Sequence, residues 1–112
     1  MVNSSSLDAI FSALSDPTRR RILERLARSP LTIGELGAEF PISQPAISKH
    51  VRVLESSGLL RREVVGRVHR CTLAPHAMQN ASAWIEKQRR FWDATLDRLG
   101  DILNAQSGEK KK

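Results

Sequence analysis

Polar side chains between residues 44 and 52 have the types and spacing needed to recognise nucleic-acid bases. The set is Gln44, Pro45, Ser48, Lys49 and Arg52. Helical spacing places them on one face, where the glutamine amide suits adenine, the serine suits several base edges, and the two cations suit guanine or phosphate. No acidic residue occurs over residues 42–54, whereas an ordinary solvated helix face usually mixes both signs.

The other face of this segment predicts how it is held. Ile47, Val51 and Leu54 recur at helical spacing and form an apolar stripe. Ser43 is a suitable N-cap, and Gly58 is a natural residue just past a helix end. We therefore expect a helix from about residue 44 to the serines before Gly58.

Three shorter helices are predicted before this one. The first contains Leu7, Ile10, Phe11 and Leu14, and the second begins after an Asp16 cap with Pro17 at its first position. The third begins at Thr32, where Glu35 completes a capping box, and it ends near Phe40.

The hydrophobic period changes from 3.6 to 2 after residue 59, which predicts a β-hairpin. Residues 60–65 and 68–73 flank Gly66-Arg67, a pair suited to a type II′ turn. This register places Glu63 opposite Arg70. Two closely joined helices followed by a basic hairpin are the order of a winged helix-turn-helix, so the predicted fold is mainly α with a small two-stranded wing and about five helices.

Several basic residues outside the polar helix face are candidates for contacts with the DNA backbone. Arg67 lies at the hairpin tip with His69 and Arg70 behind it, where an adjacent minor groove, its phosphates or plain solvent are the alternatives. Arg19 and Arg20 are further candidates. His50 flanks the buried side of its helix, and either a phosphate contact or packing fits it.

A last helix is predicted from Pro75 to about Asn104, and its apolar stripe is too long for a small domain to cover. A twofold-related copy would cover it, the alternative being that the helix folds back on its own domain. The predicted interface residues here are Trp84, Ile85, Phe91, Trp92, Leu96 and Leu99. We expect residues 1–104 to form the DNA-binding and dimerisation domain, and residues 105–112 to form a flexible basic tail.

The bulk composition fits a small DNA-binding protein. The chain has 112 residues and a net charge of +6, and the excess lies in residues 18–73, where eleven Lys or Arg face five acids. Such a basic region suits a polyanion, although a basic solvated surface is the alternative. A single cysteine, no apolar run of membrane-span length and no signal-peptide pattern predict a cytoplasmic protein.

Two segments resemble the ArsR/SmtB family of regulators. FSALSDPTRRRIL (11–23) is similar to the opening of that family, and ISQPAISKHVRVL (42–54) followed by Gly58-Leu59 is similar to its recognition helix. The resemblance implies a dimeric, mostly repressing regulator that dimerises through its first and last helices, which adds Leu7 and Phe11 to the predicted interface. Trp84, Trp92 and LDRL (96–99) resemble the non-metal, autorepressor-like branch.

The metal-sensing patterns of that family do not occur here. Residues 31–36 hold no thiol, and His76 is the sole histidine of the last helix. One cysteine and three scattered histidines do not supply the several N or S ligands that soft metals need, so no metal or other cofactor is expected. Cys71 alternates with Leu73 on its strand, which favours a packed thiol over a redox sensor.

The sequence thus predicts a homodimeric repressor that binds duplex DNA at an inverted repeat, with no membrane partner. The alternative is a winged-helix module for protein interaction, against which the cationic helix face argues. An enzyme is disfavoured because there is no Gly-rich phosphate loop, nucleophile motif or converging acid pair. No residue pattern identifies a small-molecule effector.

Overall fold

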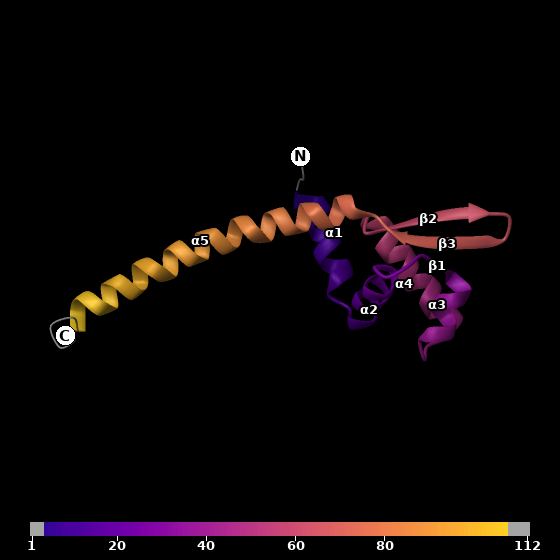
Figure 1. Cartoon of the computed structure of the whole chain (residues 1–112), viewed down its shortest axis with the longest axis horizontal. Helices are drawn as coiled ribbons and strands as arrows, with labels where there is room; N and C mark the ends of the chain where they lie inside the picture. Colours follow the sequence, from indigo (N-terminus) through magenta and orange to yellow (C-terminus); the bar gives the residue numbers. More distant parts are fainter. Residues whose placement is uncertain (1–3, 108–112) are drawn as a thin grey trace. The chain divides into compact units, whose positions relative to one another are not determined.

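The computed structural model describes residues 4–107, which belong to two compact units. The first unit is numbered 1–81 and the second 82–112. Figure 1 shows the order of the elements along the chain.

The first unit contains four complete helices, whose starts follow the predicted caps. They are α1 (Ser4–Leu14), α2 (Pro17–Leu26), α3 (Ile33–Glu39) and α4 (Gln44–Ser56). Asp16 accepts a hydrogen bond from the Arg19 amide at 3.0 Å, and Ser43 accepts one from the Ala46 amide at 3.3 Å. Thr32 and Glu35 form the reciprocal capping box, which confirms that prediction.

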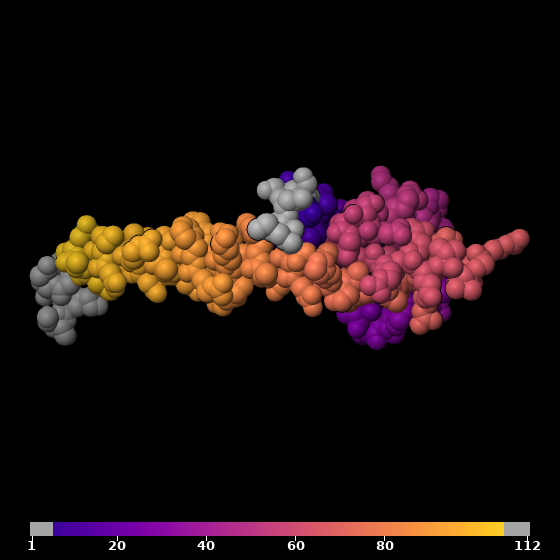
Figure 2. Space-filling view, turned by 90° about the horizontal axis from the view of Figure 1, so that it is seen from above, coloured from indigo at the N-terminus to yellow at the C-terminus, as the bar shows by residue number. Residues whose placement is uncertain are grey.

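A three-stranded antiparallel sheet follows the order β1-β3-β2. The hairpin of β2 (Leu60–Val65) and β3 (Val68–Leu73) has the predicted register, with Glu63 opposite Arg70. Gly66 has a φ of 63°, and no described residue other than glycine has a positive φ, which fits the expected type II′ turn. The hairpin projects beyond the other elements of this unit (Figures 1 and 2).

The third strand was missed by the sequence prediction, which expected a two-stranded wing. β1 is only Leu31–Thr32, and it pairs with Cys71 and Arg70 of β3. A two-residue strand has no periodicity to detect, so only the tertiary pairing reveals it. It ties the start of α3 to the base of the wing.

The core of the first unit lies between the helices and the base of the hairpin. Ile47, Val51 and Leu54 of α4 are all fully buried, which confirms the predicted apolar face. Cys71 is also fully buried, as its alternation with Leu73 predicted. Burial raises the pKa of the Cys71 thiol, which therefore stays neutral at pH 7 and packs as a small apolar group.

Helix α5 (Pro75–Ser107) begins in the first unit, where Ala77 and Ala81 join the core, and it forms all of the described second unit. It continues past the expected end near Asn104, so residues 105–107 of the predicted tail are helical, while residues 108–112 lie outside the described part. Its large apolar side chains are exposed in the single chain, including Phe91 at 58% and Trp92 at 55%.

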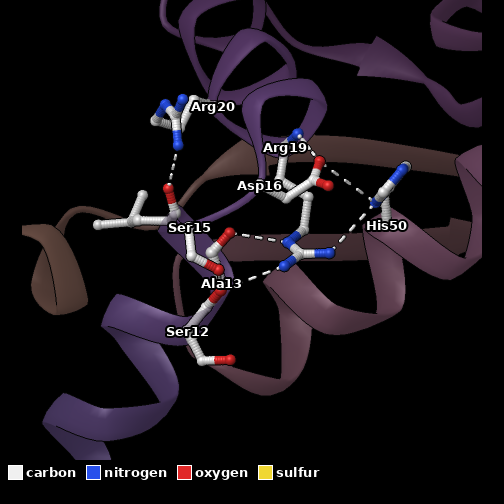
Figure 3. A network of polar contacts seen from close by, with 8 residues as sticks. Ser12, Ala13, Ser15, Asp16, Arg19, Arg20 and His50 are labelled. Atoms are coloured by element: carbon white, nitrogen blue, oxygen red, sulfur yellow. Dashed lines mark hydrogen bonds and ion pairs between the residues drawn. The ribbon is translucent and has the colours of Figure 1, made fainter.

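An arginine-centred network joins α1, α2 and α4 (Figure 3). The Arg19 guanidinium donates to the carbonyl oxygens of Ala13 at 2.7 Å and Ser12 at 3.1 Å, near the end of α1. Its Nη1 lies 3.3 Å from Nδ1 of His50 on α4, and His50 Nδ1 lies 4.0 Å from Asp16 Oδ2.

The Asp16 cap leads to a prediction about stability. The hydrogen bond from the Arg19 amide lowers the pKa of Asp16 below its ordinary value of 3.8, burial opposes this, and the charges of His50 and Arg19 add to the lowering. Asp16→Ala should therefore reduce the free energy of unfolding at pH 7 by about 1 kcal/mol, measured by urea denaturation.

The sign of the pH dependence follows from the lowered pKa. The contribution of Asp16 is present above its unfolded pKa of about 4 and is lost as the pH falls through the lower folded pKa. The difference between wild type and Asp16→Ala should thus shrink in acid. Asp8→Ala removes an exposed charge from α1 and is the control. An equal loss in both variants would contradict the capping role.

Candidate nucleic-acid interface

The outward face of α4 gathers the five side chains that the sequence predicted to contact bases. Gln44, Pro45, Lys49 and Arg52 are exposed and Ser48 is half-buried. They stand opposite the buried Ile47, Val51 and Leu54. Gln44 is the first residue of the helix, directly after the Ser43 cap, and base contacts of such helices come mainly from their N-terminal residues. The placement is as predicted, and contact with bases stays a prediction.

An open groove of about 490 Å³ lies between the start of α3, α4 and the wing. Its lining is cationic and contains no carboxylate: Thr32, Ile33, Gly34, Gln44, Ser48, Arg52, Arg62, Arg67, Val68 and His69. We call it the wing groove. Hydrogen-bonding groups and guanidinium groups together are suited to a polyanion that also presents base edges.

The predicted contact residues line two different hollows that border α4. Gln44, Ser48 and Arg52 line the wing groove, as do Arg67 and His69. Lys49 instead lines a hollow on the α1 side, with Ala9, Ser12 and Val53 among its neighbours, and Arg52 borders both. Arg70 is exposed opposite Glu63 and is not part of the groove lining.

Arg62 is a groove residue that the sequence analysis did not single out. Its Nη2 donates to Glu55 Oε1 near the end of α4 at 2.9 Å, and its Nη1 lies 3.2 Å from His69 Nδ1 on β3. Its Nε is buried without a hydrogen-bond partner among the described residues. Residues two apart in a strand face the same side, so Arg62 lies on the same face of β2 as the buried Leu60. This alternation is the sequence signal that could have identified Arg62 as an inward-facing residue.

The two arginines of α2 that were predicted to contact the DNA backbone make hydrogen bonds within the chain. Arg19 is half-buried and bonded to α1 and His50, and Arg20 Nη1 donates to the Leu14 carbonyl oxygen at 2.7 Å. Figure 3 shows both guanidinium groups directed to α1 carbonyls. Their contact with DNA phosphates stays a prediction, while the half-buried His50 beside Arg19 fits the packing alternative.

The predicted dimer contacts are partly exposed in the single chain. Leu7 and Phe11 of α1 are half-buried. On α5, the six predicted residues are all exposed: Trp84, Ile85, Phe91, Trp92, Leu96 and Leu99. The Phe91 and Trp92 rings meet edge to face with centroids 5.8 Å apart. The exposure agrees with an interface between copies, which stays a prediction.

Residues 4–107 contain neither a metal-binding cluster nor a membrane-spanning helix. No three His, Cys, Asp or Glu side chains of this part of the chain are placed to hold a metal ion. None of its helices combines the length and apolar character of a membrane span.

The chain is similar to known regulators of transcription. A family model described as a helix-turn-helix domain matches residues 14–63. HTH-type transcriptional regulator Rv2034 of Mycobacterium tuberculosis is 33% identical over 104 residues, covering 93% of this chain and 94% of that protein. Transcriptional repressor SdpR of Bacillus subtilis is 32% identical, covering 70% and 88%. The crystal structure of an ArsR family transcriptional regulator, RHA00566, superposes with a TM-score of 0.77 at 38% identity, covering 82% and 95%.

The Arg62 contacts predict how the wing is held. Arg62→Met keeps the apolar stem but removes the bond to Glu55 and the contact with His69. Amide hydrogen exchange in β2 and β3 should become faster, because the hairpin loses a link to α4. Arg61→Met, an exposed arginine on the other face of β2, is the control. Equal exchange in both variants would show that Arg62 does not anchor the wing.

Proposed function

Because the chain belongs to the ArsR/SmtB family of winged helix-turn-helix regulators, we propose that it represses transcription by binding an inverted-repeat operator as a homodimer, without sensing a metal. The chain is a DNA-binding transcriptional regulator. The observation that carries the proposed operator binding is the outward face of α4, which has no acidic residue and borders the cationic wing groove.

Four residues of the wing groove have a part in this proposal. The Gln44 amide forms a bidentate pair with an adenine edge, Ser48 bonds a neighbouring base, and Arg52 contacts guanine or phosphate. Arg67 at the wing tip contacts phosphates or the adjacent minor groove. Base contacts then set sequence preference, whereas the wing sets affinity for any duplex.

The homodimer is proposed from the apolar stripe of α5. Phe91 and Trp92 each offer an apolar area on the order of 150–250 Å², and with Leu96 and Leu99 they exceed the few hundred Å² that monomers usually expose. A twofold partner covers such a stripe with its own copy, and Leu7 and Phe11 of α1 add to the interface. Two copies of α4 then enter successive major grooves about 34 Å apart.

Repression and effector chemistry are proposed on separate grounds. The name of the similar SdpR states that it is a transcriptional repressor. A dimer of this chain bound to an operator would exclude polymerase from that stretch of DNA. One cysteine and three histidines, with Cys71 buried, do not make a zinc-type site, so DNA affinity should not respond to metal. The protein acts by binding rather than catalysis, and we place it in the cytoplasm, where it meets DNA.

The division between base and backbone contacts can be tested by mutation. Gln44→Ala with Ser48→Ala should reduce discrimination at the bases they contact by about 1–3 kcal/mol per lost pair, measured by selecting bound sequences from a random pool. Arg67→Ala should weaken all duplexes about equally and reduce the salt slope by about 1 for each copy.

Two outcomes would contradict this proposal. If the double variant kept both wild-type affinity and wild-type preference, α4 would not be the base-contacting helix. If the wild-type chain bound no duplex at low ionic strength, the interface would serve another partner, such as a protein.

The α5 stripe gives a prediction about assembly. Leu99→Glu places a charge within the stripe and should produce a monomer in sedimentation equilibrium, with loss of tight binding to the inverted repeat. Ala94→Glu adds the same charge on the opposite side of the helix, where exposed polar residues lie, and it should remain a dimer. A monomeric wild type would overturn the dimer proposal.

A further inference from the structure

The two glycines of α3 have different surroundings. A Cβ built on Gly37 would collide with Oε1 of Gln44 and would lie 3.2 Å from its Cδ and 3.5 Å from its Nε2. A Cβ on Gly34 would meet only Thr32 Oγ1, at the ordinary contact distance of 3.9 Å. The space above Gly37 is thus filled by the amide of the first residue of α4.

This close approach follows from the short turn between the helices. α3 ends at Glu39 and α4 begins at Gln44, and the two helices pack against one another. The Gln44 amide lies against the backbone of α3 because position 37 has no side chain. Among residues 4–107 no hydrogen bond occupies that amide, so its donor and acceptor groups are available at the edge of the wing groove.

We propose that Gly37 is a positioning residue for base recognition: it forms a seat that holds the Gln44 amide in the orientation that contacts the operator. A free glutamine side chain samples many rotamers, and ordering it on binding opposes affinity. Contact with the α3 backbone limits those rotamers before DNA arrives. This inference rests on the proposed role of Gln44 and adds the determinant of its orientation.

The matched variants Gly37→Ala and Gly34→Ala separate positioning from folding. Both replace a glycine of the same helix with the best helix former, so neither should lower stability through helix propensity. Gly37→Ala pushes the Gln44 amide off its seat, whereas Gly34→Ala leaves it in place. In sequence selection, Gly37→Ala should reduce discrimination at one base pair per half-site by at least about fivefold. Gly34 itself lines the wing groove, so Gly34→Ala is the control for stability and for the position of the Gln44 amide, not for DNA selection.

A double-mutant cycle tests whether the effect acts through Gln44. In the Gln44→Ala background the amide is absent, so adding Gly37→Ala should change neither base preference nor affinity further. If the single Gly37→Ala variant unfolds at a lower temperature, the double variant should recover the lost stability, because the collision is removed. An effect of Gly37→Ala that persists in full without the Gln44 amide would overturn the inference.

A measurement without DNA distinguishes this inference from the proposed function. The side-chain amide resonances of Gln44 in a ¹H–¹⁵N spectrum should shift in Gly37→Ala and remain unchanged in Gly34→Ala. Unchanged Gln44 resonances in Gly37→Ala would overturn the seat even if the protein binds its operator. Shifted resonances in a protein that binds no duplex would support the seat and refute the proposed function.

Discussion

The burial of one face of α4 is the constraint on which the rest of the molecule depends. Ile47, Val51 and Leu54 are fully buried, and each contributes about 1.5–3 kcal/mol, compared with about 0.2–1 kcal/mol for an exposed ion pair. The core therefore fixes the rotation of the helix about its axis. Because the buried residues are three and four apart, Ser48, Lys49 and Arg52 face outward, while His50 and Val53 lie at the edges of the buried face.

Two arginines refine this placement, one on each side of α4. Arg19 connects His50 with the end of α1, and Arg62 connects Glu55 with His69 of the wing. Arg20 likewise caps α1 through the Leu14 carbonyl. These three guanidinium groups are bonded within the chain, while Arg52 and Arg67 remain exposed at the wing groove. The net charge of +6 is therefore no measure of how many cationic side chains are available to contact DNA.

The features that could be predicted from the sequence are those determined by interactions between residues close together in the chain. The caps at Asp16, Thr32 and Ser43, the buried stripe of α4 and the hairpin register depend on spacings of a few residues, where periodicity and capping rules apply. Other features depend on partners in different helices or strands that folding brings together. These are the pairing of β1 with β3, the hydrogen bond from Arg62 to Glu55, and the contact of the Gln44 amide with Gly37.

The small number of exposed groove cations explains why a second copy matters for the proposed function. Affinity for DNA rises with the number of phosphates that the protein neutralises. One copy of the chain offers three exposed cations for this, Lys49 and Arg52 on α4 and Arg67 at the wing tip. A twofold partner doubles that number and makes the second contact intramolecular, which raises affinity without any new residue type. In the proposed function, the apolar residues of α5 and the polar residues of α4 thus act on the same binding equilibrium, the first by pairing two copies of the chain and the second by selecting the DNA sequence.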